Sequence, residues 1–149
     1  HRNFRTRLVK TPKLYFLDTG LAARLLGIES REQLNRHPLR GSLFENWCIA
    51  ELVKARTNRG LPANLTFWRD HVGTEIDAIA DHGQTLLPVE IKSGATVAGD
   101  WLRNLYRWRA LAGNAAEAPW LVYGGEEDQS RGGIRILSWH HIGKLGRKI

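Results

Sequence analysis

Two neighbouring strand-like segments joined by a tight turn constrain the fold more than any other feature of the sequence. Residues 75–80 and 86–92 are rich in β-forming side chains, and residues 81–84, Asp-His-Gly-Gln, have the composition of a short turn. Together they predict an antiparallel hairpin. Residues 65–69 precede the hairpin, alternate in polarity and carry two aromatic side chains, which predicts a third strand in the same sheet.

Helical patterns flank these strands and set the fold class. A long helix is predicted from Ser42, its expected N-cap, to about Arg56. Asp100 is expected to cap a second helix over residues 101–112, and residues 119–123 predict a fourth strand. The strand–helix–strand unit favours a right-handed parallel crossover. The core order α-β-β-β-α-β therefore predicts an α/β fold, in which helices flank a mixed sheet.

The remaining segments are shorter or more polar. Residues 31–40 contain His37-Pro38 and are interpreted as a connector with at most one helical turn. Residues 124–133 are interpreted as a Gly-rich loop, and residues 140–149 as a basic tail with weak helical character. The other expected elements are an extended piece, a short helix and a fifth strand, over residues 15–17, 21–26 and 134–139.

Composition limits the class of protein without defining its function. The 149 residues suit a single domain with a short extra segment. The formal net charge of +7 favours polyanionic partners, although simple solubility explains it equally well. A single cysteine, Cys48, excludes an internal disulfide and suits a reducing cytoplasm. The sequence shows no apolar run long enough to span a membrane and no signal-peptide pattern, and the missing Met suggests a piece of a longer chain.

Asp77 and Glu90 are expected to lie on the same side of the hairpin. With Gly83-Gln84 as the two-residue loop, Asp77 pairs directly with Glu90, and with His82-Gly83 as the loop the pairing shifts by one step. Close carboxylates repel each other unless a positive charge lies between them. Lys92 could supply that charge, and so could a divalent cation such as Mg²⁺. A surface ladder of ion pairs is the alternative.

A third carboxylate, Glu45, falls on the apolar side of the predicted long helix, together with Ile49 and Leu52. Ser42 and Glu45 also match the capping-box pattern S-x-x-E, which accounts for a Glu in the first helical turn. Capping does not explain why this charge faces the side that packs on the sheet. A site role and a capping role therefore both remain open.

Five short motifs are spread over nearly the whole chain: KLYFLDTGL at 13–21, GSLFEN at 41–46, FWRD at 67–70, EID at 75–77 and VEIKSG at 89–94. In this combination the sequence resembles the DUF4143 family. That family resembles a branch of the PD-(D/E)xK, or restriction-endonuclease-like, superfamily, and its members usually form the C-terminal part of prokaryotic AAA-type ATPases. The resemblance implies a restriction-endonuclease-like mixed sheet with flanking helices.

The resemblance also implies roles for individual residues. Asp77 matches the superfamily's metal-binding Asp, Glu90 and Lys92 match its (D/E)xK pair, and Glu45 matches its first-helix acid. Asp77, Glu90, Glu45 and the carbonyl of Ile91 would then hold Mg²⁺ or Mn²⁺. The metal would activate a water and neutralise charge on the scissile phosphate, while Lys92 would orient the water or stabilise the phosphorane.

The sequence departs from the superfamily pattern in two places. Ile76, rather than Pro, precedes Asp77, and the predicted helix over residues 101–112 has no Gln. Divergent branches commonly lack the Pro, and some active branches carry the Gln. These departures leave open whether the site cuts nucleic acid.

Basic and aromatic residues suggest where nucleic acid could bind. Arg103 and Arg107 lie beside Trp and Tyr side chains in the second predicted helix, a combination that suits phosphate contact and base stacking. Arg69 follows Trp68 and could also contact phosphate. In the alternative, the leucines of the helix and one Trp form an ordinary core face, and its arginines are simply solvated. The histidines lack the spacing of a zinc site.

The domain division and the competing functions follow from this resemblance. Residues 1–40 are expected to be an N-terminal extension that joins an absent ATPase or winged-helix part to the nuclease-like domain, residues 41–149. The sequence has no G-x-x-x-x-G-K-[ST] loop of its own. The first reading is a Mg²⁺-dependent endonuclease acting on nucleic acid, with DNA expected. The others are a silent module that binds nucleic acid or docks on its own ATPase domain, and a structural domain without metal.

Overall fold

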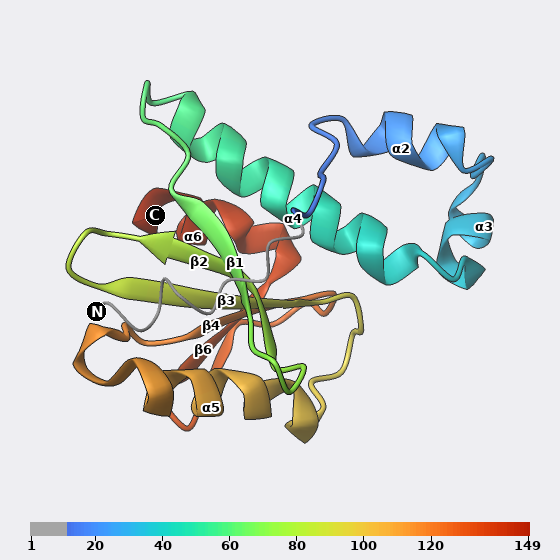
Figure 1. Cartoon of the computed structure of the whole chain (residues 1–149). Coiled ribbons are helices and arrows are strands. Elements are labelled where there is room, and N and C mark those ends of the chain that lie inside the picture. The colour runs from blue at the N-terminus through green and yellow to red at the C-terminus, as the bar shows by residue number, and fades with distance from the viewer. Residues whose placement is uncertain (1–11) are drawn as a thin grey trace.

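The computed structural model describes residues 12–149, and the first part of the expected N-terminal extension lies outside this range. One six-stranded mixed sheet, in the order β1-β2-β3-β4-β6-β5, lies between helices (Figure 1). The strands are β1 (Leu65–Arg69), β2 (Glu75–Asp81), β3 (Leu86–Lys92), β4 (Trp120–Tyr123), β5 (Gln129–Arg131) and β6 (Ile134–Ser138). The helices are α2 (Thr19–Leu25), α3 (Arg31–Arg36), α4 (Arg40–Thr57), α5 (Arg103–Ala112) and α6 (Ile142–Lys148). The predicted α/β class is confirmed, and α4-β1-β2-β3-α5-β4 follow in the predicted order.

The hairpin has the first of the two predicted registers. Ala78 pairs with Val89, and the N–H of His82 donates to the carbonyl of Thr85 at 3.0 Å, which makes Gly83-Gln84 the two-residue loop. Gly83 has a φ of +86°, as the first loop position of a type II′ turn requires. The pairing ends at Ala78 and Val89, so Asp77 and Glu90 are the next residues along the two strands. Farther along the sheet, β3 pairs with β4 in parallel across the α5 crossover, as predicted.

Two hydrophobic cores lie on opposite faces of the sheet. Helices α4 and α6 cover one face, and α5 covers the other (Figure 1). The first core contains Cys48 and Leu52 of α4 together with Leu145 of α6, and all three are fully buried. The second is built around Leu105 and Trp108 of α5. Burying each large apolar side chain contributes about 1.5–3 kcal/mol, so both faces stabilise the sheet on which the candidate site lies.

Several local predictions are wrong, and their errors share a cause. Helix α4 begins at Arg40 after Leu39, without a side-chain cap, so Ser42 lies inside the helix and forms no capping box with Glu45. The true capping box joins Ser30 and Gln33 and starts α3, where only a connector was expected. Asp100 lies in a 3₁₀ turn, Gly99–Leu102, rather than capping α5. Helix starts depend on where packing positions the first turn, and short polar side chains mark that place only loosely.

The C-terminal third is more ordered than its composition suggests. The expected loop over residues 124–133 contains strand β5, which pairs with β6 at the edge of the sheet. The basic tail forms α6, whose Ile142 and Leu145 are buried against α4. Among the described residues, no helix is both long and apolar enough to cross a membrane.

Candidate active site

Strands β2 and β3 bring three of the predicted site residues together. The ammonium nitrogen of Lys92 lies 2.6 Å from Oε1 of Glu90 and 3.7 Å from Oδ2 of Asp77. The same Asp77 oxygen accepts a hydrogen bond from the backbone N–H of Ile91 at 2.8 Å. Ile91 thus meets Asp77 through its N–H, whereas the resemblance implied a role for its carbonyl. The pairing of β2 with β3 brings these residues onto neighbouring strands.

An irregularity in β2 changes the direction of the Asp77 side chain. Ile76 and Ile79 are three residues apart, yet both pack in the core on the α5 face, which strict alternation does not allow. The pairing of β1 with β2 shifts between Thr66 and Trp68, as at a β-bulge. Asp77 consequently lines a cavity of about 280 Å³ together with Ile49 of α4. Strict alternation along residues 75–80 predicts that Asp77 and Ile79 share one face, and the structure shows that this prediction is wrong.

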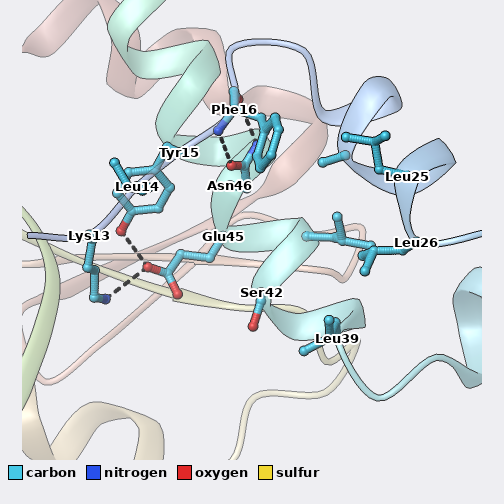
Figure 2. Close-up of a pocket in the computed structure, with 12 residues that line it drawn as sticks. Lys13, Leu14, Tyr15, Phe16, Leu25, Leu26, Leu39, Ser42, Glu45 and Asn46 are labelled. Carbon is cyan, nitrogen blue, oxygen red and sulfur yellow. Dashed lines mark hydrogen bonds and ion pairs between the residues drawn. The ribbon is translucent and has the colours of Figure 1, made fainter.

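Glu45 joins this group through residues that precede α2. Its Oε1 atom accepts hydrogen bonds from the ammonium of Lys13 at 3.0 Å and from the hydroxyl of Tyr15 at 2.7 Å (Figure 2). The same ammonium lies 3.9 Å from Oδ1 of Asp77 and forms an ion pair with Glu75. Lys13 therefore connects Glu45 of α4 with two acids of β2.

Sequence reasoning assigned no site role to Lys13, Tyr15 or Glu75. Lys13 and Tyr15 were noticed only as members of the first family motif. One signal could have found Lys13: three acids meet Lys92 alone in the predicted site, so a further cation is needed to balance them. The alternation of Lys13 and Tyr15 with apolar neighbours is consistent with two polar side chains facing the same way.

Burial dominates the electrostatics of the two central acids. Asp77 is 8% exposed and Glu90 is 3% exposed. Burial, reinforced by the Asp77 carboxylate and opposed by Lys92, raises the pKa of Glu90 to about 7. Burial likewise raises the pKa of Asp77 despite the opposing charge of Lys92. Ionising two buried carboxyl groups this close together costs free energy, and a cation placed beside them would lower that cost.

For the two lysines and Glu75, the charged partners outweigh burial in setting the pKa. Burial alone would lower the pKa values of Lys13 and Lys92, but their carboxylate partners outweigh it and raise both. Burial alone would raise the pKa of Glu75, but its partners Lys13 and Arg69 lower it. Both ammonium groups are therefore charged at neutral pH.

The donor set fits a hard divalent cation in its chemistry. Carboxylate oxygens of Asp77, Glu90 and Glu45 are the ligands that Mg²⁺ and Mn²⁺ prefer. Within residues 12–149, Oε2 of Glu90 is buried and has no hydrogen-bond partner, so it is free to accept a cation. In the same range, no three or more His, Cys, Asp and Glu side chains stand close enough together to hold a metal as they are placed. The ammonium groups of Lys13 and Lys92 lie among the donors instead.

A larger cavity of about 440 Å³ adjoins the site without containing its central acids. Leu25 and Leu43 are among the apolar residues that line it, and Lys13, Glu45 and Asn46 are among the polar ones (Figure 2). Asp77 and Glu90 do not line this cavity. The candidate site therefore adjoins this cavity through Lys13, Tyr15 and Glu45.

The three arginines predicted to bind nucleic acid have different surroundings. Arg69 donates from Nε to Glu75 at 2.8 Å, and Arg107 lies 3.6 Å from Asp70. Arg103 is exposed on α5. The apolar side of α5 buries Leu102, Leu105 and Trp108, while Leu111, expected in that core face, is 48% exposed.

The fold and the site geometry thus define the class of protein: an α/β domain with acidic and lysine side chains gathered on neighbouring strands of its sheet. The chain belongs to the family described as Domain of unknown function (DUF4143), whose profile matches residues 40–142. A second profile, Domain of unknown function (DUF8612), matches residues 1–32. Lys13 and Tyr15 therefore come from the second matched region, while the acids come from the first.

Two curated relatives match the chain. They are Uncharacterized protein Mb2031c of Mycobacterium bovis and Uncharacterized protein Rv2008c of Mycobacterium tuberculosis. Each is 33% identical over 94 residues, which cover 63% of this chain and 20% of the relative. The chain thus spans about a fifth of the length of these relatives.

Proposed function

We propose that this domain is a nuclease of the PD-(D/E)xK class, which hydrolyses phosphodiester bonds of nucleic acid, with DNA as the expected substrate, and depends on Mg²⁺ or Mn²⁺. The observation that carries the proposal is the grouping of Asp77, Glu90 and Lys92 on adjacent strands, with Lys92 within 3.7 Å of both acids. Glu45 reaches the same group from α4 through Lys13. Three acids and a lysine in this order along the chain are what the superfamily resemblance requires.

In this proposal the buried acids bind the metal and Lys92 acts on the phosphate. Asp77, Glu90 and Glu45 would hold the cation, which when bound supplies Lewis acidity toward the phosphate and a more acidic water. Lys92 keeps its positive charge because its carboxylate neighbours raise its pKa. A fixed ammonium beside the acids attracts a phosphate oxygen and stabilises the charge that develops during hydrolysis. The low exposure of Asp77 and Glu90 limits competition from bulk water.

A second candidate is a silent module with the same fold, which binds nucleic acid or docks on its own ATPase domain. It is favoured by the two ammonium groups that stand among the acids within residues 12–149, and by the absence there of a ready three-ligand arrangement. The relatives are about five times longer than the matched part, which leaves room for an ATPase part like the one the resemblance implies. A cytoplasmic location is part of both proposals, and the free, buried thiol of Cys48 suits it.

A plasmid-nicking assay with Mg²⁺ and with Mn²⁺ separates the two candidates. Asp77→Asn and Lys92→Met remove one ligand or one charge with little change in volume, so we expect each to reduce nicking at least about 100-fold. Asp81→Asn, at the exposed end of the same strand, and Lys54→Met, on the exposed side of α4, are matched controls that keep activity. Nicking by both site variants at the rate of the unaltered protein would remove the nuclease assignment. No nicking by the unaltered protein, nor by a Lys13→Met variant that frees Glu45 and Asp77 from the Lys13 ammonium, would favour the silent module.

A further inference from the structure

Lys13 occupies the place between carboxylates that a bound cation would need. Its ammonium lies 3.0 Å from Glu45 and 3.9 Å from Asp77, and it also pairs with Glu75. Two of these three acids are proposed metal ligands. The Lys13 side chain is only 25% exposed, so this is a partly buried position rather than a surface contact.

A lysine ammonium and a divalent cation cannot share these carboxylates. Mg²⁺ requires ligand oxygens about 2.0–2.1 Å away, closer than any ammonium contact, and two positive charges a few ångströms apart repel each other strongly in a partly buried site. The lysine also directs Glu45 and Asp77 toward its own nitrogen. Metal binding by Glu45 and Asp77 therefore requires the Lys13 side chain to leave.

Uncharged contacts hold the segment that carries Lys13 in place. The backbone N–H of Phe16 donates to Oδ1 of Asn46 at 2.7 Å, and Nδ2 of Asn46 donates back to the carbonyl of Phe16 at 2.8 Å (Figure 2). Asn46 follows Glu45 on α4 and is 7% exposed. Tyr15 adds its hydrogen bond to Glu45. Residues 13–16, here named the N-terminal strap, are thus fixed beside the acids independently of the charge of Lys13.

We propose that the N-terminal strap is an autoinhibitory device: Lys13 substitutes for the metal at Glu45 and Asp77, and the site becomes competent when the strap releases it. This proposal rests on the proposed function and adds regulation to the same site. The strap lies in the chain region matched by one family profile and the acids in the region matched by another. A change in the position of the N-terminal region would then control metal occupancy.

Calorimetric titration of the full chain with Mn²⁺ tests the strap directly, without relying on activity. Lys13→Met keeps the aliphatic volume and removes the charge, so we expect it to bind Mn²⁺ at least about tenfold more tightly than the unaltered protein. Lys54→Met, which removes another carboxylate-paired lysine from the exposed side of α4, should leave the affinity unchanged. Adding Asp77→Asn to Lys13→Met should remove the increase in Mn²⁺ affinity. That result would show that the additional Mn²⁺ binding involves Asp77.

A second variant loosens the strap while leaving every charge in place. Asn46→Ala removes both hydrogen bonds to Phe16, so we expect tighter Mn²⁺ binding than in the unaltered protein and faster tryptic cleavage after Lys13. This variant also supports or overturns the proposal if Lys13→Met does not fold, as judged by circular dichroism.

The possible outcomes separate the strap from the nuclease assignment. If Lys13→Met and Asn46→Ala both bind Mn²⁺ no more tightly than the unaltered protein does, the strap proposal is wrong, while the metal site itself is still supported. A Lys13→Met protein that loses both Mn²⁺ affinity and nicking would make Lys13 part of the catalytic machinery, which also overturns the strap. If none of the folded proteins binds Mn²⁺, the proposed function and the strap fail together.

Discussion

Cys48 lies one turn beyond Glu45 on α4, and no part of its surface is exposed. Burial raises the pKa of its thiol, and the nearby Asp77 carboxylate adds to the shift. Because the thiolate is the reactive form, we expect Cys48 to resist an aromatic disulfide reagent in the folded protein and to react promptly in denaturant. Absorbance of the released thiol measures both rates, with Cys48→Ala as the blank. Prompt reaction of the folded protein would show that α4 separates from the sheet.

At the residue scale, the sequence predicts site residues best where the backbone fixes their positions. Asp77, Glu90 and Lys92 lie on neighbouring strands joined by a tight turn, so their proximity could be predicted, whereas the direction of the Asp77 side chain could not. Lys13 reaches the acids through a tertiary contact across 32 sequence positions, and no local pattern encodes such a contact. Glu45 lies between these cases: its helix was predicted, but the capping explanation failed because Ser42 lies inside the helix.

At the element scale, the strands were predictable and their irregularities were not. Leu65–Arg69 and Leu86–Lys92 have the predicted bounds, because flanking turns and β-forming side chains define them. The shift in the β1–β2 pairing changes the direction of the Asp77 side chain, and no local sequence pattern marks it. Strand β5 has three residues, too few to produce a pattern, and it exists because β6 offers an edge.

Asp128 joins the segment before β5 to the end of β6 and to α6. It accepts hydrogen bonds from the Ser138 N–H at 2.9 Å and the Lys144 ammonium at 2.6 Å, and it contacts His141 at 2.9 Å. Partial burial acts in the opposite direction, but these partners lower the pKa of Asp128 to about 2. A carboxyl with a depressed pKa stabilises the fold fully above its unfolded value of about 3.9, and this contribution disappears as the pH falls toward 2.

We therefore expect Asp128→Asn to lower the free energy of unfolding at pH 7 by about 0.5–1 kcal/mol, a modest amount because the side chain is partly exposed. The difference from the unaltered protein should shrink between about pH 4 and pH 2. Urea denaturation followed by circular dichroism across this range measures it. Glu127→Gln, an exposed neighbour, is the control and should show no pH-dependent difference. A constant difference at every pH would mean that the ionisation of Asp128 does not stabilise the fold.

At the scale of the whole molecule, charge is distributed in two opposing ways. The chain carries a formal net charge of +7, yet the candidate site gathers four carboxylates around two lysines. A nucleic-acid backbone would be repelled by these acids unless a cation lay between them, so basic side chains outside the site must supply the initial attraction. The elements that form this site could be predicted from local patterns. The positive charge that Lys13 contributes to the site depends on the strap, and only the complete fold brings the strap next to the acids.

Helix α5 is the element where this attraction can be tested without cleavage. In an Asp77→Asn background, we expect duplex DNA to bind with an affinity that falls linearly with the logarithm of salt concentration. Arg103 is exposed, so Arg103→Ala should reduce that slope by about one, the value for one lost phosphate contact. Arg107→Ala should change it less, because Asp70 lies 3.6 Å from the guanidinium and already offsets part of its charge.

Arg36→Ala is the matched control for this measurement, since that arginine is also exposed but lies at the end of α3, away from α5 (Figure 1). Fluorescence anisotropy of labelled DNA at several salt concentrations gives all four slopes. If Arg36→Ala lowered the slope as much as Arg103→Ala, binding would reflect the overall positive charge of the chain rather than a surface on α5. A slope that depends on Arg103 and not on Arg36 would instead place DNA on the α5 side of the sheet.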